Sequence, residues 1–328
     1  MQTERSSILD ETIATIDAIL GSELDEMTVE RVVIGLFFTG VKLSNGSTGS
    51  CATPIKTIPE AVCCPSSAMA MPFPGKLAGR RAVDLAREAL SGHGIRRAVG
   101  IAAVNALADY CWQSRPHPDV ELCPGIDAFD ATEIRKGHKV VVVGAFVPFL
   151  KELKRRGQPF LVLEQDAATL KADELPFFRQ AEQAPEILPE ADVVLITGST
   201  LVNNTLEDLL ALARPEARVT IVGPTVGMLP DAFLARGADV LGCVKITAPD
   251  TFLDLLAEGD RATISAAARR RRSCSRAGPS ASIPGSHKTG RTAPPIGGSG
   301  STLNGFASLR SRGEEQTIHR VAVTDLSS

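Results

Sequence analysis

The sequence predicts a two-domain α/β protein whose second domain is a Rossmann-like, doubly wound parallel sheet. The 328 residues, 44% of them hydrophobic, are enough to bury the cores of two ordinary domains. Residues 29–54 read as a β meander that contains the hairpin turn signal Asn45-Gly46. Beyond residue 125, short apolar runs without polar alternation are separated by helical segments. Such runs are typical of strands buried on both faces, as in a parallel sheet covered by helices.

The first domain is predicted over residues 1–125 as a helix, the meander and two further helices. Apolar residues recur at helical spacing over residues 7–20. Two more helices are expected within residues 79–90 and 96–112. The second of these is nearly apolar and rich in small residues, so we expect it to pack in the interior.

The second domain is predicted over residues 126–260. Proline and polar residues at 113–130 indicate a linker, and we place the boundary near Gly125. Five apolar runs are expected to form the strands of the sheet: KVVVVGAF, PFLVLE, ADVVLITGS, ARVTIVGPT and ADVLGCVKI. Residues 261–328 are rich in Arg, Ser, Gly and Pro, which predicts a disordered basic tail. We interpret this tail as an extension, or an out-of-frame stretch, in preference to a basic anchor.

Charge and hydropathy exclude several classes of function. Residues 261–328 contain ten Arg, one Lys and three acidic residues, a net charge of +8. Because the whole chain has a net charge of −3, residues 1–260 carry −11. An acidic folded part argues against nucleic acid as a partner. No apolar run reaches the roughly 20 residues that cross a bilayer, and the charged N-terminus is unlike a signal peptide. We therefore expect a cytoplasmic protein without a membrane partner, and a homo-oligomer is compatible with the sequence.

The loops at the carboxyl ends of the strands are the first candidates for a site, because open parallel sheets bind their ligands there. The turn after the first strand has the single glycine Gly144 and lacks the G-x-G-x-x-G pattern of dinucleotide binding. Glu164 ends the second strand twenty residues later, where a Rossmann protein places the carboxylate that holds ribose hydroxyls. The position of Glu164 is compatible with a nucleoside ligand. The favoured interpretation is that Glu164 is simply a polar residue at the end of a strand.

Polar residues also follow the next two strands. After the third strand, hydroxyl and amide side chains lie just before and at the start of a predicted helix. After the fourth strand, a glycine and a proline form a rigid turn that also carries a hydroxyl. Free N–H groups at a helix start bind anions or polar ligands, whereas Ser199 or Thr200 could simply cap that helix. Both interpretations stay open for this group, which comprises Thr197, Gly198, Asn203, Asn204, Thr205, Gly223, Pro224 and Thr225.

Metal-binding and catalytic motifs are scarce. The sequence has no C-x-x-C, no H-x-x-x-H and no G-x-S-x-G, and its seven cysteines form no disulfide framework. The vicinal pair Cys63-Cys64, with Cys51 nearby, could hold a thiophilic metal, although buried free thiols are the favoured interpretation. No reaction follows from these residues, and whether the protein is an enzyme stays open.

Five segments in this order resemble the putative heavy-metal chelation family. They are VGIAAVNALA at 99–108, the VVVVGAFVPF turn, the strand that ends in Glu164, ADVVLITGSTLVNNTLEDLL at 191–210 and VGPTVGMLPDAFLARGADVLG at 222–242. The resemblance covers about residues 5–259. It implies an N-terminal domain similar to that of enolase, a C-terminal Rossmann-like domain, and a cleft between them.

The resemblance also implies a function and a set of residues. The cleft is expected to bind or chelate a metal or a metal-bearing small molecule, so that the cofactor is a heavy-metal ion or metal chelate. An enzyme that uses a nucleoside cofactor, of the S-adenosylmethionine or NAD type, is the less favoured alternative. By motif, the ligand-binding residues are Asn105, Gly144, Phe146, Glu164, Thr197, Gly198, Asn203, Thr205, Gly223, Pro224 and Thr225. Asn105 stands inside an apolar helix, where its amide must find partners, either a ligand or neighbouring backbone.

Overall fold

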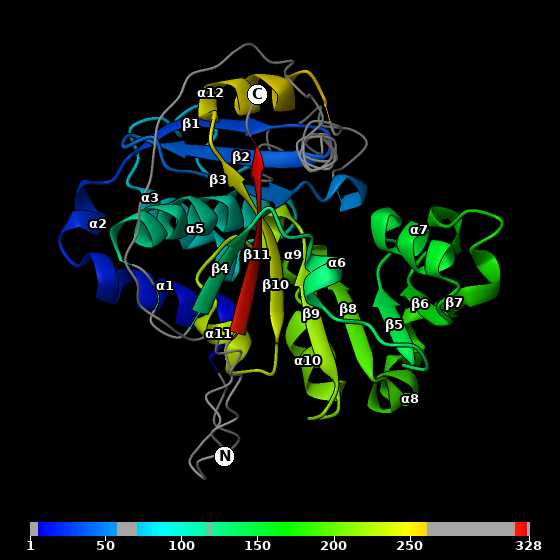
Figure 1. Cartoon of the computed structure of the whole chain (residues 1–328). Coiled ribbons are helices and arrows are strands. Elements are labelled where there is room, and N and C mark those ends of the chain that lie inside the picture. The colour runs from blue at the N-terminus through cyan, green and yellow to red at the C-terminus, as the bar shows by residue number, and fades with distance from the viewer. Residues whose placement is uncertain (1–5, 58–70, 116, 118–119, 261–318, 327–328) are drawn as a thin grey trace, which may run out of the picture.

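A three-stranded antiparallel sheet and an eight-stranded parallel sheet form the framework of the molecule (Figure 1). The computed structural model describes residues 6–57, 71–115, 117, 120–260 and 319–326. The elements of the N-terminal half are α1 (Ile8–Leu20), α2 (Glu23–Glu26), β1 (Val29–Ile34), β2 (Phe38–Leu43), β3 (Thr48–Ala52), η1 (Ile55–Thr57), α3 (Ala82–Ala86), α4 (Glu88–Ser91) and α5 (Ile95–Ser114).

The predicted meander is confirmed, and its turn is where the sequence placed it. Strands β1, β2 and β3 pair antiparallel in that order. Gly46 adopts a φ of +88° in the turn between β2 and β3, a conformation that glycine reaches without a steric cost. The first helix, α1, begins at a capping box formed by Ser7 and Asp10.

Helix α5 is the central helix of the molecule. It packs against β2 and β3 of the meander on one side, and its residues Ala98 to Ala108 are all buried. Gly49 of β3 allows the close approach, because a Cβ there would lie 2.3 Å from the carbonyl oxygen of Ala102. The expectation of a small-residue helix in the interior is thus confirmed.

The parallel sheet contains all five predicted strands. The elements of this half are β4 (Val120–Pro124), α6 (Ala128–Ala131), β5 (Val140–Val143), α7 (Val147–Arg156), β6 (Phe160–Glu164), β7 (Phe178–Gln180), α8 (Ala184–Ile187), β8 (Val193–Thr197), α9 (Ser199–Val202), α10 (Leu206–Leu212), β9 (Arg218–Val222), η7 (Pro224–Val226), α11 (Asp231–Leu234), β10 (Val240–Ile246), α12 (Pro249–Ala257) and β11 (His319–Leu326). Four further single turns of 3-10 helix lie at Ala167–Thr169, Leu175–Phe177, Ala181–Gln183 and Leu188–Glu190.

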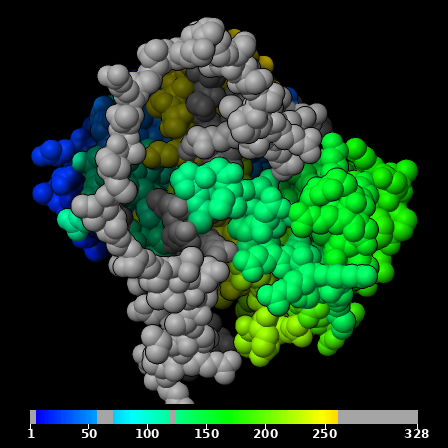
Figure 2. Space-filling view, in the orientation of Figure 1, coloured from blue at the N-terminus to red at the C-terminus, as the bar shows by residue number. Residues whose placement is uncertain are grey.

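The strand order is that of a doubly wound sheet. From β7 to β10 the order is β7-β6-β5-β8-β9-β10, so the strands run three, two, one, four, five, six in the sense of a Rossmann fold. Alternate residues of each strand face opposite cores: Val141 and Val143 belong to one hydrophobic cluster, and Val140 and Val142 to the other. Helices α6 and α7 cover the second face. Figure 2 shows the region of α7, β6 and β7 as a lobe at one side of the molecule.

The predicted linker and tail need correction. Part of the linker, Val120–Pro124, is the edge strand β4. Within the tail, His319–Leu326 forms β11, which lies between β10 and β4 and pairs parallel with both (Figure 1). Both errors have one cause: the composition of the surrounding segment hides the strand, since β4 follows a proline-containing polar stretch and HRVAVTDL follows a segment rich in Arg, Ser, Gly and Pro. Residues 261–318 lie outside the described residues.

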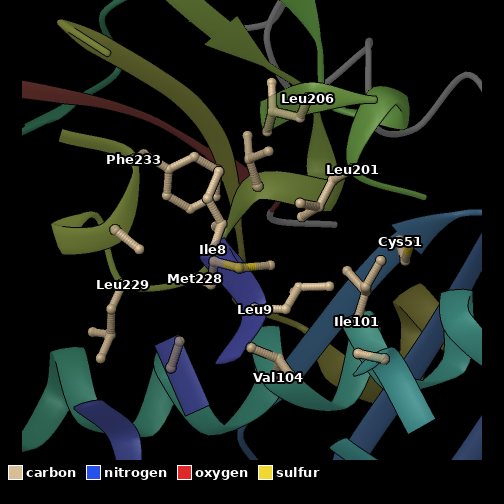
Figure 3. Packing of buried hydrophobic residues seen from close by; sticks show 14 of the residues in the cluster. Ile8, Leu9, Cys51, Ile101, Val104, Leu201, Leu206, Met228, Leu229 and Phe233 are labelled. Atoms are coloured by element: carbon tan, nitrogen blue, oxygen red, sulfur yellow. The ribbon is translucent and has the colours of Figure 1, made fainter. Parts of the chain in front are cut away.

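The two predicted domains share one hydrophobic core. Ile8 and Leu9 of α1 and Ile101 of α5 pack in the same cluster as Leu201, Leu206 and Phe233 (Figure 3). From the other end of the chain, α12 packs against β1 and β2 of the meander. This cluster therefore spans both halves of the described chain and holds the N-terminal elements over the carboxyl ends of β8 and β9. The similarity of the first domain to enolase stays a prediction.

Candidate functional site

The carboxyl ends of β5 and β8 meet at Gly144, which must be a glycine. Its φ is +89°, and a Cβ there would lie 2.4 Å from Cγ2 of Thr197. Both the backbone conformation and the lack of space exclude a side chain at this position. The first predicted turn and the third strand end are thus in direct contact.

Glu164 closes this turn from the end of β6. Its Oε2 accepts a hydrogen bond of 2.9 Å from the backbone N–H of Ala145, and its Oε1 accepts one of 2.8 Å from Gln165. The side chain is half-buried. A carboxylate thus holds the β5–α7 turn through the amide that follows Gly144.

The turns after β8 and β9 lie against each other. The N–H of Gly198 donates to the carbonyl oxygen of Val222 over 2.7 Å. A Cβ at Gly198 would lie 3.3 Å from Cβ of Thr225, and one at Gly223 would lie 3.6 Å from the nitrogen of Gly198. The hydroxyl of Thr197 is 3.1 Å from that of Ser199. We call the group formed by Gly144, Glu164, Thr197, Gly198 and Gly223 to Thr225 the crevice rim, after the position at which open parallel sheets bind their ligands.

Asn105 joins this rim to the meander. Its Nδ2 donates to the carbonyl oxygens of Ser50 over 2.7 Å, Thr225 over 2.9 Å and Pro224 over 3.4 Å. The residue is only 3% exposed. Of the two interpretations offered by the sequence, hydrogen bonds to backbone are present, and they connect β3 of the first domain with η7 of the second.

The other predicted site residues make their contacts with the protein's own elements. The hydroxyl of Thr205 donates to the carbonyl oxygen of Thr200 over 3.4 Å, Asn203 is exposed in the turn between α9 and α10, and Asn204 accepts from Arg97. The ring of Phe146 packs edge to face on Phe149, with 4.7 Å between the ring centroids. These contacts hold the protein's own elements together.

Sequence reasoning missed an ion pair that connects the two halves beside the rim. Lys56 Nζ, in η1, lies 2.8 Å from Oδ2 of Asp166, which follows β6. The hydrogen bond raises the pKa of Lys56 and lowers that of Asp166. The two residues are 110 positions apart, so no local pattern could have paired them. Both side chains are exposed, and the pair adds one charge of each sign to the approach to Glu164.

Comparison with known families follows the same division of the chain. Residues 18–108 match one family model and residues 127–274 match a second, and both carry the description "Putative heavy-metal chelation". The chain belongs to the putative heavy-metal chelation family. The second match extends past residue 260, where the sequence alone placed the end of the fold.

Relatives of the family agree in sequence or in fold. An uncharacterized protein of Methanocaldococcus jannaschii is 29% identical over 162 residues, which cover 48% of this chain and 58% of that protein. The structure of a DUF364 family protein of unknown function from Pyrococcus horikoshii is similar, with a TM-score of 0.59, 20% identity, and coverage of 77% of this chain and 94% of that one. A second structure of a DUF364 family protein of unknown function, from Desulfitobacterium hafniense, has a TM-score of 0.57 and 23% identity, and the match covers 76% of this chain and 92% of that one. At these identities the two structures show the shared fold.

The described residues do not form a metal centre of their own. No group of three or more His, Cys, Asp or Glu in this part of the chain is placed to hold a metal ion. Burial raises the pKa of the Cys51, Cys111 and Cys243 thiols to about 12. These thiols stay protonated at neutral pH, and the thiol is a far weaker ligand than the thiolate. Cys63 and Cys64 lie outside the described residues.

The buried thiols give a prediction that labelling can check. Native protein treated with iodoacetamide at pH 8 should leave Cys51 and Cys111 unmodified, because the pKa of each thiol lies far above that pH and both side chains are buried. The same peptides, measured by mass spectrometry after unfolding in denaturant, should be fully modified. Rapid modification of Cys51 in the native protein would contradict the burial described here.

Two pockets lie away from the crevice rim. One, of about 360 Å³, is formed by the opposite ends of β5 and β6 with α8, and Val140, Phe160 and Glu186 line it. The other, of about 470 Å³, lies between α1, α10 and α11, and Glu11, Glu207 and Arg236 line it. In the part of the chain that the structure describes, no helix is both long and apolar enough to cross a bilayer.

Proposed function

We propose that the crevice rim binds a small molecule that carries a metal ion in its own chelating groups. The observation that carries this proposal is the position of Glu164, whose carboxylate lies on the β5–α7 turn. In Rossmann proteins the backbone amides of this turn bind phosphate. Here Ala145 already donates to a carboxylate, so the turn presents negative charge where a phosphate would need positive charge. A metal complex, or a ligand with a cationic part, suits such a rim.

The donor atoms favour a chelate over a bare ion. The rim offers the carboxylate of Glu164, hydroxyls such as Thr197 and backbone groups, which are too few for a complete coordination sphere. A molecule that supplies most ligands of its metal needs from the protein only shape, hydrogen bonds and one carboxylate. If the bound molecule supplies most of the metal ligands, the described residues need no ligand cluster of their own. The proposal thereby agrees with the family description of chelation.

A nucleoside cofactor is the second candidate, and one observation favours it. The order of the six strands from β7 to β10 is that of dinucleotide-binding sheets. Two observations oppose it. The turn has a single glycine in place of the G-x-G-x-x-G pattern, and the Ala145 N–H and the Glu164 carboxylate, which would bind phosphate and ribose, are hydrogen-bonded to each other. We therefore rank this candidate second.

Glu164→Gln is the variant that tests the proposal. We expect Ni²⁺–citrate or Fe³⁺–hydroxamate complexes to raise the Tm of the full chain, and the rise to disappear in Glu164→Gln. A ligand at 100 times its Kd stabilises a protein by about 2.7 kcal/mol, which a thermal melt resolves. The amide oxygen can still accept from the Ala145 N–H while the charge is removed, and water can replace the acceptor of the exposed Gln165 bond, so the turn itself should persist.

Glu186→Gln is the matched control, because Glu186 lies at the opposite ends of the same strands. It should keep the full response to the complexes. Free chelators, free metal ions, NAD and S-adenosylmethionine complete the screen. A response to a nucleoside cofactor alone would replace the proposal by the second candidate, and a metal-complex response that survives Glu164→Gln would remove the crevice rim as the site.

A further inference from the structure

Residues 52–56 of the first half connect opposite sides of the crevice rim. At one end, the backbone N–H of Ala52 donates to Oγ1 of Thr225, in the turn after β9, over 3.0 Å. At the other end, Lys56 Nζ lies 2.8 Å from Oδ2 of Asp166, which follows β6. Strands β8 and β5 lie between β9 and β6 in the sheet, so these two strands are about 14 Å apart. The segment therefore places the Lys56 side chain at the Glu164 end of the rim.

The ammonium group of Lys56 keeps donors available for a ligand. An ammonium group has three N–H donors, and in the described structure Lys56 donates to Asp166. The side chain of Lys56 is 70% exposed and that of Asp166 is 50% exposed. A molecule in solvent thus reaches the ammonium group directly and needs no enclosed cavity. Because exposed ion pairs contribute little to stability, another anion can replace Asp166 as the partner of Lys56 at a small cost.

The charges at this end of the rim are of both signs. The hydrogen bond to Asp166 raises the pKa of Lys56, and the charges of Asp166 and Glu164 raise it further, so Lys56 is a cation at neutral pH. Both oxygens of Asp166 accept hydrogen bonds, Oδ2 from Lys56 and Oδ1 from the backbone N–H of Ala168. A ligand at this end of the rim therefore meets the carboxylate of Glu164 and, within range of its charge, an exposed ammonium group.

We propose that Lys56 binds an anionic group of the ligand, so that the crevice rim selects metal complexes that carry a carboxylate. This inference rests on the proposed function and specifies the class of complex. The metal-bearing part of such a complex lies toward Glu164, and its carboxylate forms a charge-assisted hydrogen bond with Lys56. Because this contact is close to solvent, salt weakens it. Lys56 thus distinguishes one complex from another and does not bind the metal itself.

Lys56→Met in the full chain tests the inference by titration calorimetry with two complexes of opposite charge. Ni²⁺–citrate is anionic, whereas the Fe³⁺ complex of a linear trihydroxamate with a terminal amine is cationic and has no carboxylate. We expect the Kd of Ni²⁺–citrate to rise about tenfold in Lys56→Met at low salt. The Kd of the trihydroxamate complex should stay unchanged or fall. Lys56→Arg keeps the charge and should retain most of the affinity for Ni²⁺–citrate.

Two further variants separate a lysine that binds an anion from one that only fixes the segment. Lys139→Met is the matched control, because Lys139 forms an exposed ion pair with Glu190 over 3.2 Å at the other end of the sheet, next to the start of β5. It should change neither Kd. Asp166→Asn keeps an oxygen for the Ala168 N–H, releases Lys56 and removes a negative charge, so it should lower the Kd of Ni²⁺–citrate. If the ion pair only fixes the segment, Asp166→Asn should instead raise this Kd as Lys56→Met does.

The outcomes distinguish a failure of this inference from a failure of the proposed function. An unchanged Kd of Ni²⁺–citrate in Lys56→Met, equal losses for both complexes, or weaker citrate binding in Asp166→Asn would overturn the inference and leave the proposed function standing. Binding of the trihydroxamate complex alone to the wild-type chain would do the same. If neither complex binds to the wild-type chain, the proposed function fails and the inference fails with it.

Discussion

Arg97→Met is expected to destabilise the protein by about 3 kcal/mol, because it leaves buried acceptors without a donor. Arg97 of α5 is 7% exposed. Its guanidinium donates to the carbonyl oxygens of Leu201 over 3.1 Å and Ala89 over 2.8 Å, and to Oδ1 of Asn204 over 2.9 Å. Methionine fills a similar volume and offers no donor. Equilibrium unfolding in denaturant measures the loss.

The environment of Arg97 explains why the effect should be large. Desolvation lowers the pKa of this guanidinium, and the described residues place no carboxylate within salt-bridge distance of it. Its hydrogen bonds go to neutral acceptors: Leu201 and Asn204 lie in the other half of the molecule, and Ala89 lies in its own half. One of them, Asn204, has a left-handed φ of +59° in the turn between α9 and α10, and this conformation loses its support in the variant.

Arg96→Met is the matched control, one residue earlier in the same helix. Arg96 pairs with Glu88 over 2.6 Å and is 29% exposed, so the contact lies within the N-terminal half and near solvent. Partly exposed ion pairs contribute about 0–1 kcal/mol. Equal losses in Arg96→Met and Arg97→Met would show that Arg97 does not hold the two halves together.

Ala322→Pro should be the most disruptive change in the C-terminal segment. Ala322 pairs with Gly242 of β10 on one side and with Cys123 of β4 on the other. Proline removes a backbone N–H, and a strand between two others does not tolerate it. In the described structure β4 pairs with β11 alone, so β4 should lose its place as well. We expect a loss of about 3 kcal/mol or more, measured by equilibrium unfolding, and faster proteolysis near residues 120–124.

Ala322→Ser is the control for this prediction, because serine keeps the N–H and nearly the volume of alanine. It should behave like the wild-type chain. If limited proteolysis removes the C-terminal segment from the native protein while β4 stays protected, the insertion of β11 between β4 and β10 is wrong.

Periodicity predicted most of the fold correctly. The five apolar runs were recognisable as strands because a parallel sheet covered on both faces leaves no polar alternation in them. The meander was recognisable from Asn45-Gly46, since a tight turn with positive φ restricts residue choice. Strand β7 (Phe178–Gln180), β4 and β11 escaped because they are short or lie in segments of unfavourable composition.

The candidate site was predictable in its loops and not in its contacts. Strand ends pointed to Gly144, Glu164 and Thr197, and the structure brings these together. Asn203 and Thr205 follow in the same polar segment, beyond the four-residue helix α9, where Thr205 bonds to Thr200. Lys56 and Asp166 could not be paired from the sequence, because their contact depends on how the two halves are arranged.

The sequence by itself determined the succession of elements, the parallel character of the second sheet and the need for a polar rim at its strand ends. These properties follow from local periodicity and from residues with special backbone preferences. Only the tertiary structure decided that Glu164 binds the Ala145 amide, that Asn105 joins Ser50 to Thr225, and that β11 lies within the sheet. Each of these is a contact between distant segments, and its partner is chosen by the packing of the whole core.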